Sequence, residues 1–118
     1  MAETYDSVLD RMSAFNVVTE RLSKGRAATV GVTIAGRPEC WLRLTRTADS
    51  YRVELPAEGS DRAAAEELKF KQAGESLVRE IRKGERSWTV AGELEDMLHD
   101  VLGLPADVAI SVETEESG

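Results

Sequence analysis

Hydrophobic residues near the N-terminus recur every three or four positions, which is the spacing of one face of a helix. This stripe consists of Tyr5, Val8, Met12, Phe15, Val18 and Leu22. Thr4 or Asp6 can cap the start of such a helix, and Gly25 suits its end. The pattern predicts a first helix with most of its stripe in the core. Packing of part of the stripe on a second copy of the chain is the alternative.

The hydrophobic period then falls to about two residues, which indicates β-strands. Apolar and polar residues alternate over 28–34, 40–45 and 51–55. The connections between these segments are short, so an antiparallel three-stranded meander is expected. One face of the meander is apolar and should pack on helices.

A loop at 56–59 precedes a second helix that begins near Arg62, and the end of this helix has two interpretations. Helical spacing from Phe70 to Ile81 favours a single helix to Lys83, although Gly74 in its middle costs about 1 kcal/mol relative to alanine. The alternative is a hairpin of 76–82 and 86–90. In that hairpin Arg79 would lie between Leu77 and Ile81 on the apolar face.

The C-terminal quarter predicts a third helix and a short final strand. Leu94, Met97, Leu98, Val101 and Leu102 have helical spacing, and Gly103 ends the pattern. Val108, Ile110 and Val112 then alternate with polar or small residues. The expected fold is α+β: an N-terminal helix, an antiparallel three-stranded meander, then two helices with short additional strands packed on one face of the sheet. Residues 1–112 form a single domain, and 113–118 are expected to be an acidic disordered tail.

Charge is distributed unevenly along the 118 residues. The net charge is -7, and the segment after Arg86 has eight acidic residues and no Lys or Arg. Such a segment acts as a solvated extension or as a docking surface for a basic partner. The lone Cys40, the acidic N-terminus and the shortness of every apolar run favour a cytoplasmic protein without membrane contact.

No residue pattern points to catalysis. His99 is the single histidine and is expected to be a solvated residue near the polar side of the third helix. Cys40 alternates with Leu42 and Leu44, so it is interpreted as a small core residue. Paired acids such as Glu93 and Asp96 are interpreted as solvent-facing. The sequence therefore predicts no enzyme, no catalytic residues, no metal site and no cofactor.

The polar face of the meander is the candidate binding surface. Trp41, Arg43 and Arg52 are predicted to lie together on it. Tryptophan and arginine are the residues most enriched at protein interfaces, so these three are predicted to bind a partner polypeptide. The alternative is that a later segment covers this face.

The order of elements resembles that of the small acidic chaperones of type III secretion systems and their YbjN-like bacterial relatives. The resemblance rests on Phe70-Lys71-Gln72-Ala73-Gly74, on Trp88, and on a leucine-rich segment from Leu94 to Pro105. It requires the hairpin interpretation of 76–90. It implies a homodimeric, non-enzymatic protein that binds extended segments of a partner polypeptide.

The sequence thus favours a protein- or peptide-binding chaperone or adaptor that uses the open face or an edge of its sheet. Two other functions remain open. An immunity or antitoxin-like protein would neutralise a basic partner through the acidic C-terminal quarter. A YbaB-like nucleic-acid-binding module is disfavoured, because the net charge of -7 repels a polyanion and no basic stripe is present.

Overall fold

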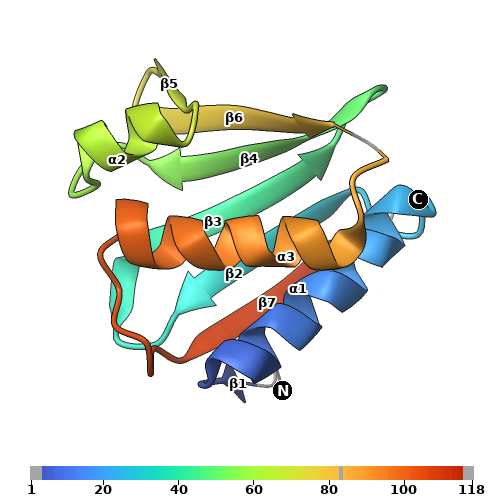
Figure 1. Cartoon of the computed structure of the whole chain (residues 1–118), viewed down its shortest axis with the longest axis horizontal. Helices are drawn as coiled ribbons and strands as arrows, with labels where there is room; N and C mark the ends of the chain where they lie inside the picture. The colour runs from blue at the N-terminus through green and yellow to red at the C-terminus, as the bar shows by residue number, and fades with distance from the viewer. Residues whose placement is uncertain (1–3, 83, 116–118) are drawn as a thin grey trace.

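The computed structural model describes residues 4–82 and 84–115. This part of the chain folds as an α+β protein with three α-helices and a seven-stranded antiparallel sheet (Figure 1). The helices are α1 (Val8–Ser23), α2 (Arg62–Glu67) and α3 (Ser87–Asp96), and α3 continues as a π-helical turn over Met97–Val101. The strands are β1 (Thr4–Tyr5), β2 (Thr29–Ile34), β3 (Arg37–Arg46), β4 (Ser50–Pro56), β5 (Lys71–Ala73), β6 (Ser76–Arg82) and β7 (Ile110–Glu115).

The sheet has the strand order β1-β7-β2-β3-β4-β6-β5. β2, β3 and β4 are antiparallel neighbours in chain order, and the β5–β6 hairpin extends the sheet beyond β4. On the other side, β7 lies between β1 and β2. The predicted three strands are thus the middle of a larger sheet.

The C-terminal strand differs from its prediction. Glu113–Glu115 belong to β7, so the expectation of a disordered tail from residue 113 is wrong for these three residues. They pair with β2, because the backbone groups on that side of β2 need hydrogen-bond partners. Residues 116–118 of the predicted tail lie outside the described residues.

Helix α1 begins later than its apolar stripe suggests. Ser7 caps it by accepting a hydrogen bond from the Asp10 N–H, and Tyr5 is part of β1. Val8 is 44% exposed, so the buried stripe starts beyond it. Gly25, with φ of +72°, follows the helix end in a conformation that glycine adopts readily.

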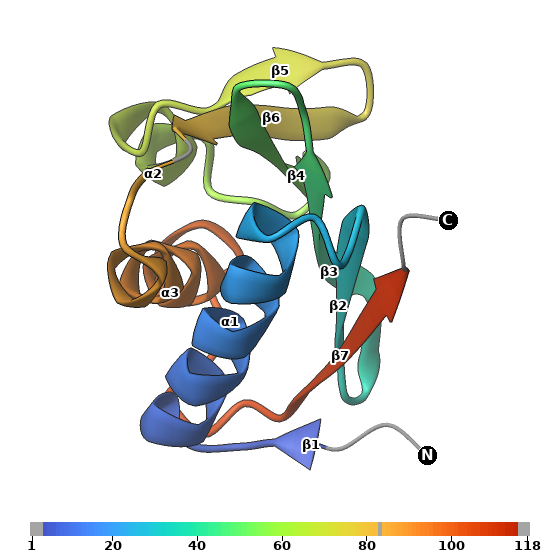
Figure 2. The same cartoon turned by 90° about the vertical axis from the view of Figure 1, so that its right-hand side faces the viewer.

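Helices α1 and α3 lie on the same face of the sheet (Figure 2). The core forms between them and the inward side chains of the strands, which include Val30, Leu44, Val53 and Ile110. On the opposite face only Pro56, at the end of β4, is buried among the described strand residues. No helix in the described ranges is long and apolar enough to span a membrane.

The segment 76–90 forms neither the predicted single helix to Lys83 nor the predicted hairpin. Residues 76–82 form β6, but their hairpin partner is β5, and 86–90 contribute the start of α3. Gly74 makes the β5–β6 turn with φ of +62°, which explains why a glycine interrupts the apolar pattern there. Arg79 does lie between Leu77 and Ile81 on the helix-covered face, and its Nη2 is 3.4 Å from Glu93 Oε1 on α3.

Candidate functional site

Trp41, Arg43 and Arg52 all lie on the face of the sheet that the helices leave uncovered. Trp41 and Arg43 are two residues apart on β3, and Thr45 is opposite Arg52 on β4. The guanidinium carbon of Arg43 is 5.8 Å from the centre of the Trp41 ring, within cation–π distance. Trp41 is half-buried, whereas both arginines are exposed. No described segment covers this face.

The two arginines have acidic neighbours across the strands. Arg43 is opposite Glu54, and Arg52 is opposite Glu80. Opposite charges at such positions stabilise a sheet modestly. Arg52 lines its own shallow hollow of about 420 Å³ with Glu54 and Glu80. Trp41 and Arg43 therefore form the more closely associated pair.

The pairing of β3 with β4 ends beside Trp41. The ladder stops at Arg43 and Glu54, and continuing it by two residues would bring Pro56 opposite Trp41. Proline has no N–H to donate, and the carbonyl oxygen of Pro56 already accepts a hydrogen bond of 2.6 Å from Ser60 Oγ. Pro56 therefore explains why the ladder ends at this point.

Among the described β3–β4 pairs, none includes Trp41. Arg46 donates its N–H to Ala28 at 2.9 Å, so the even-numbered residues of β3 direct their backbone groups toward β2. Because backbone groups alternate along a strand, those of Arg43 and Trp41 point toward β4. Arg43 is paired with Glu54 there, whereas Trp41 lies beyond the last assigned pair.

Trp41 lines a groove of about 850 Å³, here called the Trp41 groove. Its walls come from the N-terminal half of β3, the loop after β4 and the turn between β5 and β6, and they include Trp41, Pro56 and Glu75. Arg62 at the start of α2 also lines the groove, and it donates to Oε1 of Gln72, another lining residue, at 2.6 Å. This hydrogen bond holds α2 beside β5 at the edge of the groove. The size lies within the range of ordinary ligand sites.

Cys40 lies beside the groove but faces the other way. It is half-buried and packs against the core, close to the prediction for this residue. Burial and, to a smaller extent, the Glu39 carboxylate raise the pKa of the Cys40 thiol, while Arg37 opposes them. The thiol is therefore protonated near neutral pH, which does not suit a nucleophile.

A second polar cluster, which sequence reasoning missed, is buried under α1. The Arg11 side chain is fully buried and donates from Nε and Nη2 to Glu95 Oε1 at 3.0 and 2.6 Å. The same guanidinium donates to the carbonyl oxygens of Val108 at 2.8 Å and Ala106 at 2.7 Å. Arg11 therefore ties α1 to α3 and to the loop that leads into β7.

His99 completes this cluster, so the expectation of a solvated histidine is wrong. Its Nε2 is 2.8 Å from Glu95 Oε1, and its Nδ1 is 2.8 Å from the carbonyl oxygen of Leu104. Since both ring nitrogens face acceptors, the imidazolium form satisfies both. Burial lowers the pKa of His99, but the Leu104 carbonyl and Glu95 outweigh burial and the nearby Arg11 charge, and the pKa lies above its usual 6.5.

Two signals in the sequence could have indicated this cluster. Arg11 lies four residues before Phe15, in the middle of the apolar stripe of the first helix. Glu95 and His99 have the spacing of neighbours on one helix face. Both ring nitrogens of His99 already have partners, one in Glu95 and the other in the carbonyl oxygen of Leu104. The Glu95 carboxylate also accepts from Arg11. The cluster is thus suited to holding elements together rather than to transferring protons to a substrate.

Comparison of this chain with protein families, curated proteins and solved structures finds no match.

Proposed function

We propose that this protein is a non-enzymatic adaptor or chaperone that binds an extended segment of a partner polypeptide in the Trp41 groove. The observation that carries the proposal is the end of the β3–β4 ladder. The last β3–β4 pair is Arg43 with Glu54, and Trp41, two residues further along β3, lines the groove. A polypeptide in extended conformation can form backbone hydrogen bonds with a strand at such a place, with little demand on its own sequence.

The side chains around the groove suit the same occupant. The indole of Trp41 offers an apolar surface, and the Arg43 guanidinium beside it can bind carbonyl or carboxylate oxygens of the segment. Arg52 contributes at the neighbouring hollow on the same face. No catalytic step is assigned to any residue.

Replacement of Trp41 by alanine tests the proposal. Short linear peptides are first selected on the wild-type protein from a random display library. Trp41→Ala should weaken their binding about thirtyfold, because truncating an interface tryptophan commonly costs about 2 kcal/mol. Cooperative thermal unfolding should be retained. Trp88→Ala is the matched control, since Trp88 is 49% exposed on α3, away from the groove.

A second variant keeps the test decisive if Trp41→Ala fails to fold. Glu75 is exposed at the β5–β6 turn, so Glu75→Trp should fill the groove from its opposite wall without disturbing the core. Peptide binding that survives Glu75→Trp, or that falls equally in the Trp41 and Trp88 variants, would overturn the proposed site. In a Trp88→Phe background, Trp41 is the single tryptophan, and its emission should shift to shorter wavelength when peptide binds.

A further inference from the structure

The walls of the Trp41 groove carry an excess of negative charge. Its lining residues include three acids, Glu39, Glu58 and Glu75, and one base, Arg62. The acids come from three separate parts of the chain, which are β3, the loop after β4 and the turn between β5 and β6. All three are exposed. Carboxylates therefore border the groove on more than one wall.

The single base of the lining is already engaged inside the protein. Arg62 donates from Nη1 to Oε1 of Gln72 at 2.6 Å. By contrast, within the described residues no ion pair includes any of the three carboxylates. The groove therefore presents negative charge to an occupant.

Trp41 adds a second feature that favours a cation. The face of an indole ring attracts positive charge, and the guanidinium carbon of Arg43 lies 5.8 Å from the centre of this ring. The same side chain also lines the groove. A basic side chain placed there would meet both an aromatic ring and carboxylates.

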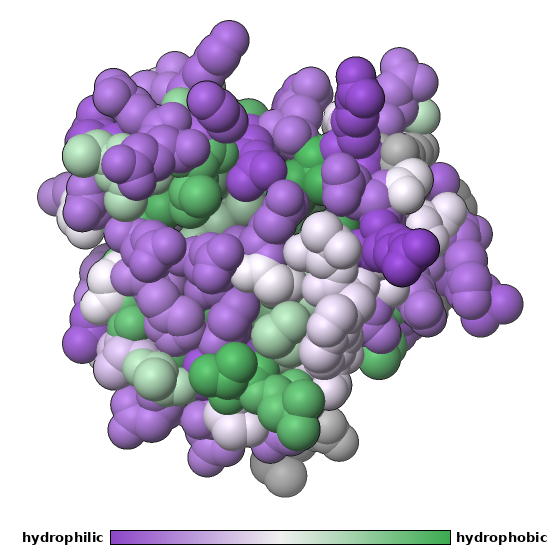
Figure 3. All heavy atoms as spheres, in the orientation of Figure 1, coloured by the Kyte–Doolittle hydropathy of each residue, from purple (hydrophilic) through white to green (hydrophobic). Residues whose placement is uncertain are grey.

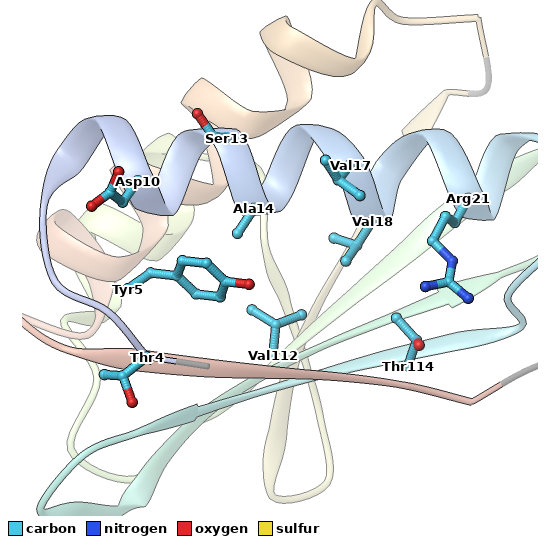
Figure 4. Close-up of a pocket in the computed structure, with 10 residues that line it drawn as sticks. All are labelled: Thr4, Tyr5, Asp10, Ser13, Ala14, Val17, Val18, Arg21, Val112 and Thr114. Carbon is cyan, nitrogen blue, oxygen red and sulfur yellow. The ribbon is translucent and has the colours of Figure 1, made fainter. Parts of the chain in front are cut away.

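The groove between α1 and β7 provides a comparison within the same molecule (Figure 4). Its volume is about 560 Å³, and its described lining holds one acid, Asp10, and one base, Arg21. These two charges balance. The acidic excess of the Trp41 groove is thus a local property, distinct from the net charge of -7 that the whole chain carries.

We propose, resting on the function proposed above, that the segment bound in the Trp41 groove is basic. Its lysine or arginine side chains would pair with Glu39, Glu58 and Glu75. Complementary charge speeds association with such a partner and disfavours acidic competitors. The net charge of -7 assists the approach of the same partner from a distance.

Three capped octapeptides provide the probes, in which valine alternates with lysine, glutamine or glutamate. Fluorescence anisotropy of labelled copies gives their affinities. The lysine peptide should bind about tenfold more tightly than the glutamine peptide, because exposed ion pairs contribute about two- to threefold each. The glutamate peptide should bind most weakly.

The triple variant Glu39→Gln/Glu58→Gln/Glu75→Gln removes the groove carboxylates and nearly keeps the size of the side chains. In this variant the advantage of the lysine peptide over the glutamine peptide should fall below about threefold. An advantage that stays at about tenfold would overturn the proposal. If the variant fails to unfold cooperatively, the three peptides on the wild-type protein decide.

The matched control for net charge is Asp10→Asn/Glu20→Gln/Asp96→Asn. It neutralises the same number of exposed acids, on α1 and α3. The advantage of the lysine peptide should remain at about fivefold or more, because only long-range attraction is lost. Equal losses in the two triple variants would overturn the pairing with the groove carboxylates.

Trp41→Ala separates failure of this proposal from failure of the proposed function. Equal affinity for the three peptides, together with a loss of about thirtyfold in Trp41→Ala, would reject the basic partner and leave the groove as the binding site. Binding that is unchanged in both Trp41→Ala and Glu75→Trp would reject the groove itself.

Two further measurements cover the remaining outcomes. If the octapeptides bind too weakly to measure, peptides selected from the display library on the wild-type protein should be richer in lysine and arginine than those selected on the groove triple variant. Equal content would overturn the proposal. Light scattering should give the same mass with and without saturating lysine peptide, and a halved mass would identify a second copy of the chain as the occupant instead.

Discussion

A single buried arginine connects three parts of the molecule. Arg11 pairs with Glu95 on α3 and with two carbonyl oxygens of the loop before β7. A buried guanidinium is strongly destabilising without its partners, although the complete pair adds little relative to apolar residues. The cluster therefore acts mainly by allowing only one arrangement of these elements.

We expect Arg11→Ala to lower the free energy of unfolding by about 3–5 kcal/mol, because it leaves Glu95 buried without its main partner. Urea denaturation measures the change. Arg11→Lys should restore little, since an ammonium cannot reproduce the guanidinium geometry. Arg52→Ala, at an exposed position, is the control and should change stability by less than about 0.5 kcal/mol. A loss below about 1 kcal/mol for Arg11→Ala would contradict this role.

The charge on His99 should make stability depend on pH. Its pKa is raised in the folded protein, so its contribution is complete below the unfolded pKa near 6.5 and is lost as pH rises through the folded value. Denaturation of wild type and His99→Gln should show a stability difference that shrinks as pH rises from below that value. A difference independent of pH would contradict the assignment. As the single histidine, His99 also gives one imidazole NMR signal whose midpoint should exceed 6.5.

At this scale the sequence predicts side-chain direction better than side-chain partnership. The alternation along β3 and β4 was enough to place Trp41, Arg43 and Arg52 on one face. A pattern of apolar and polar positions could not reveal that Arg11 contacts Glu95, because these two residues are brought together by the packing of α1 on α3. Glu95 therefore looked like one more solvent-facing acid of the C-terminal quarter.

The same limit explains the error at β6. Leu77 and Ile81 are four residues apart, a spacing that fits one face of a helix and also one face of a strand. Arg79 between them made a buried strand face look unfavourable. In the structure Arg79 is tolerated on this face because Glu93 on α3 lies 3.4 Å from it. The sequence pattern around Arg79 could not predict this contact. Strands β2, β3 and β4 were predictable because each alternates over five or more residues.

The position of β7 reverses an expectation about truncation. A solvated tail could be removed without cost, but deletion of residues 113–118 removes the half of β7 that pairs with Thr29 and Gly31. We expect a loss of about 2–4 kcal/mol, since several backbone hydrogen bonds are worth about 1 kcal/mol each. Glu113→Gln/Glu115→Gln keeps the strand and should unfold like wild type. Equal stability of the truncated and full-length proteins in urea would contradict the placement of β7.

For the molecule as a whole, the exposed apolar residues of α1 favour self-association. Leu9 is 67% exposed and Val8 44% exposed, and hydrophobic side chains gather over this end of the helix (Figure 3). We expect light scattering in the tens of micromolar to give about twice the monomer mass of 12.9 kDa. Leu9→Glu should restore the monomer without loss of folding, while Trp88→Ala should not. A wild-type monomer at these concentrations would contradict the dimer.

The pairing of Val32 with Val112 also determines when β2 can complete its pairing during translation. While a ribosome extends the chain, β2 has its β3 neighbour early but must wait until every other strand of this sheet has been made before β7 is available. During that interval one edge of β2, with Val30 and Ile34 beside it, is open to other nascent chains. Contacts so distant in sequence also slow folding. Shortage of chaperones during rapid expression should therefore cause this protein to aggregate before translation ends, through β2 rather than through either outer edge of the finished sheet.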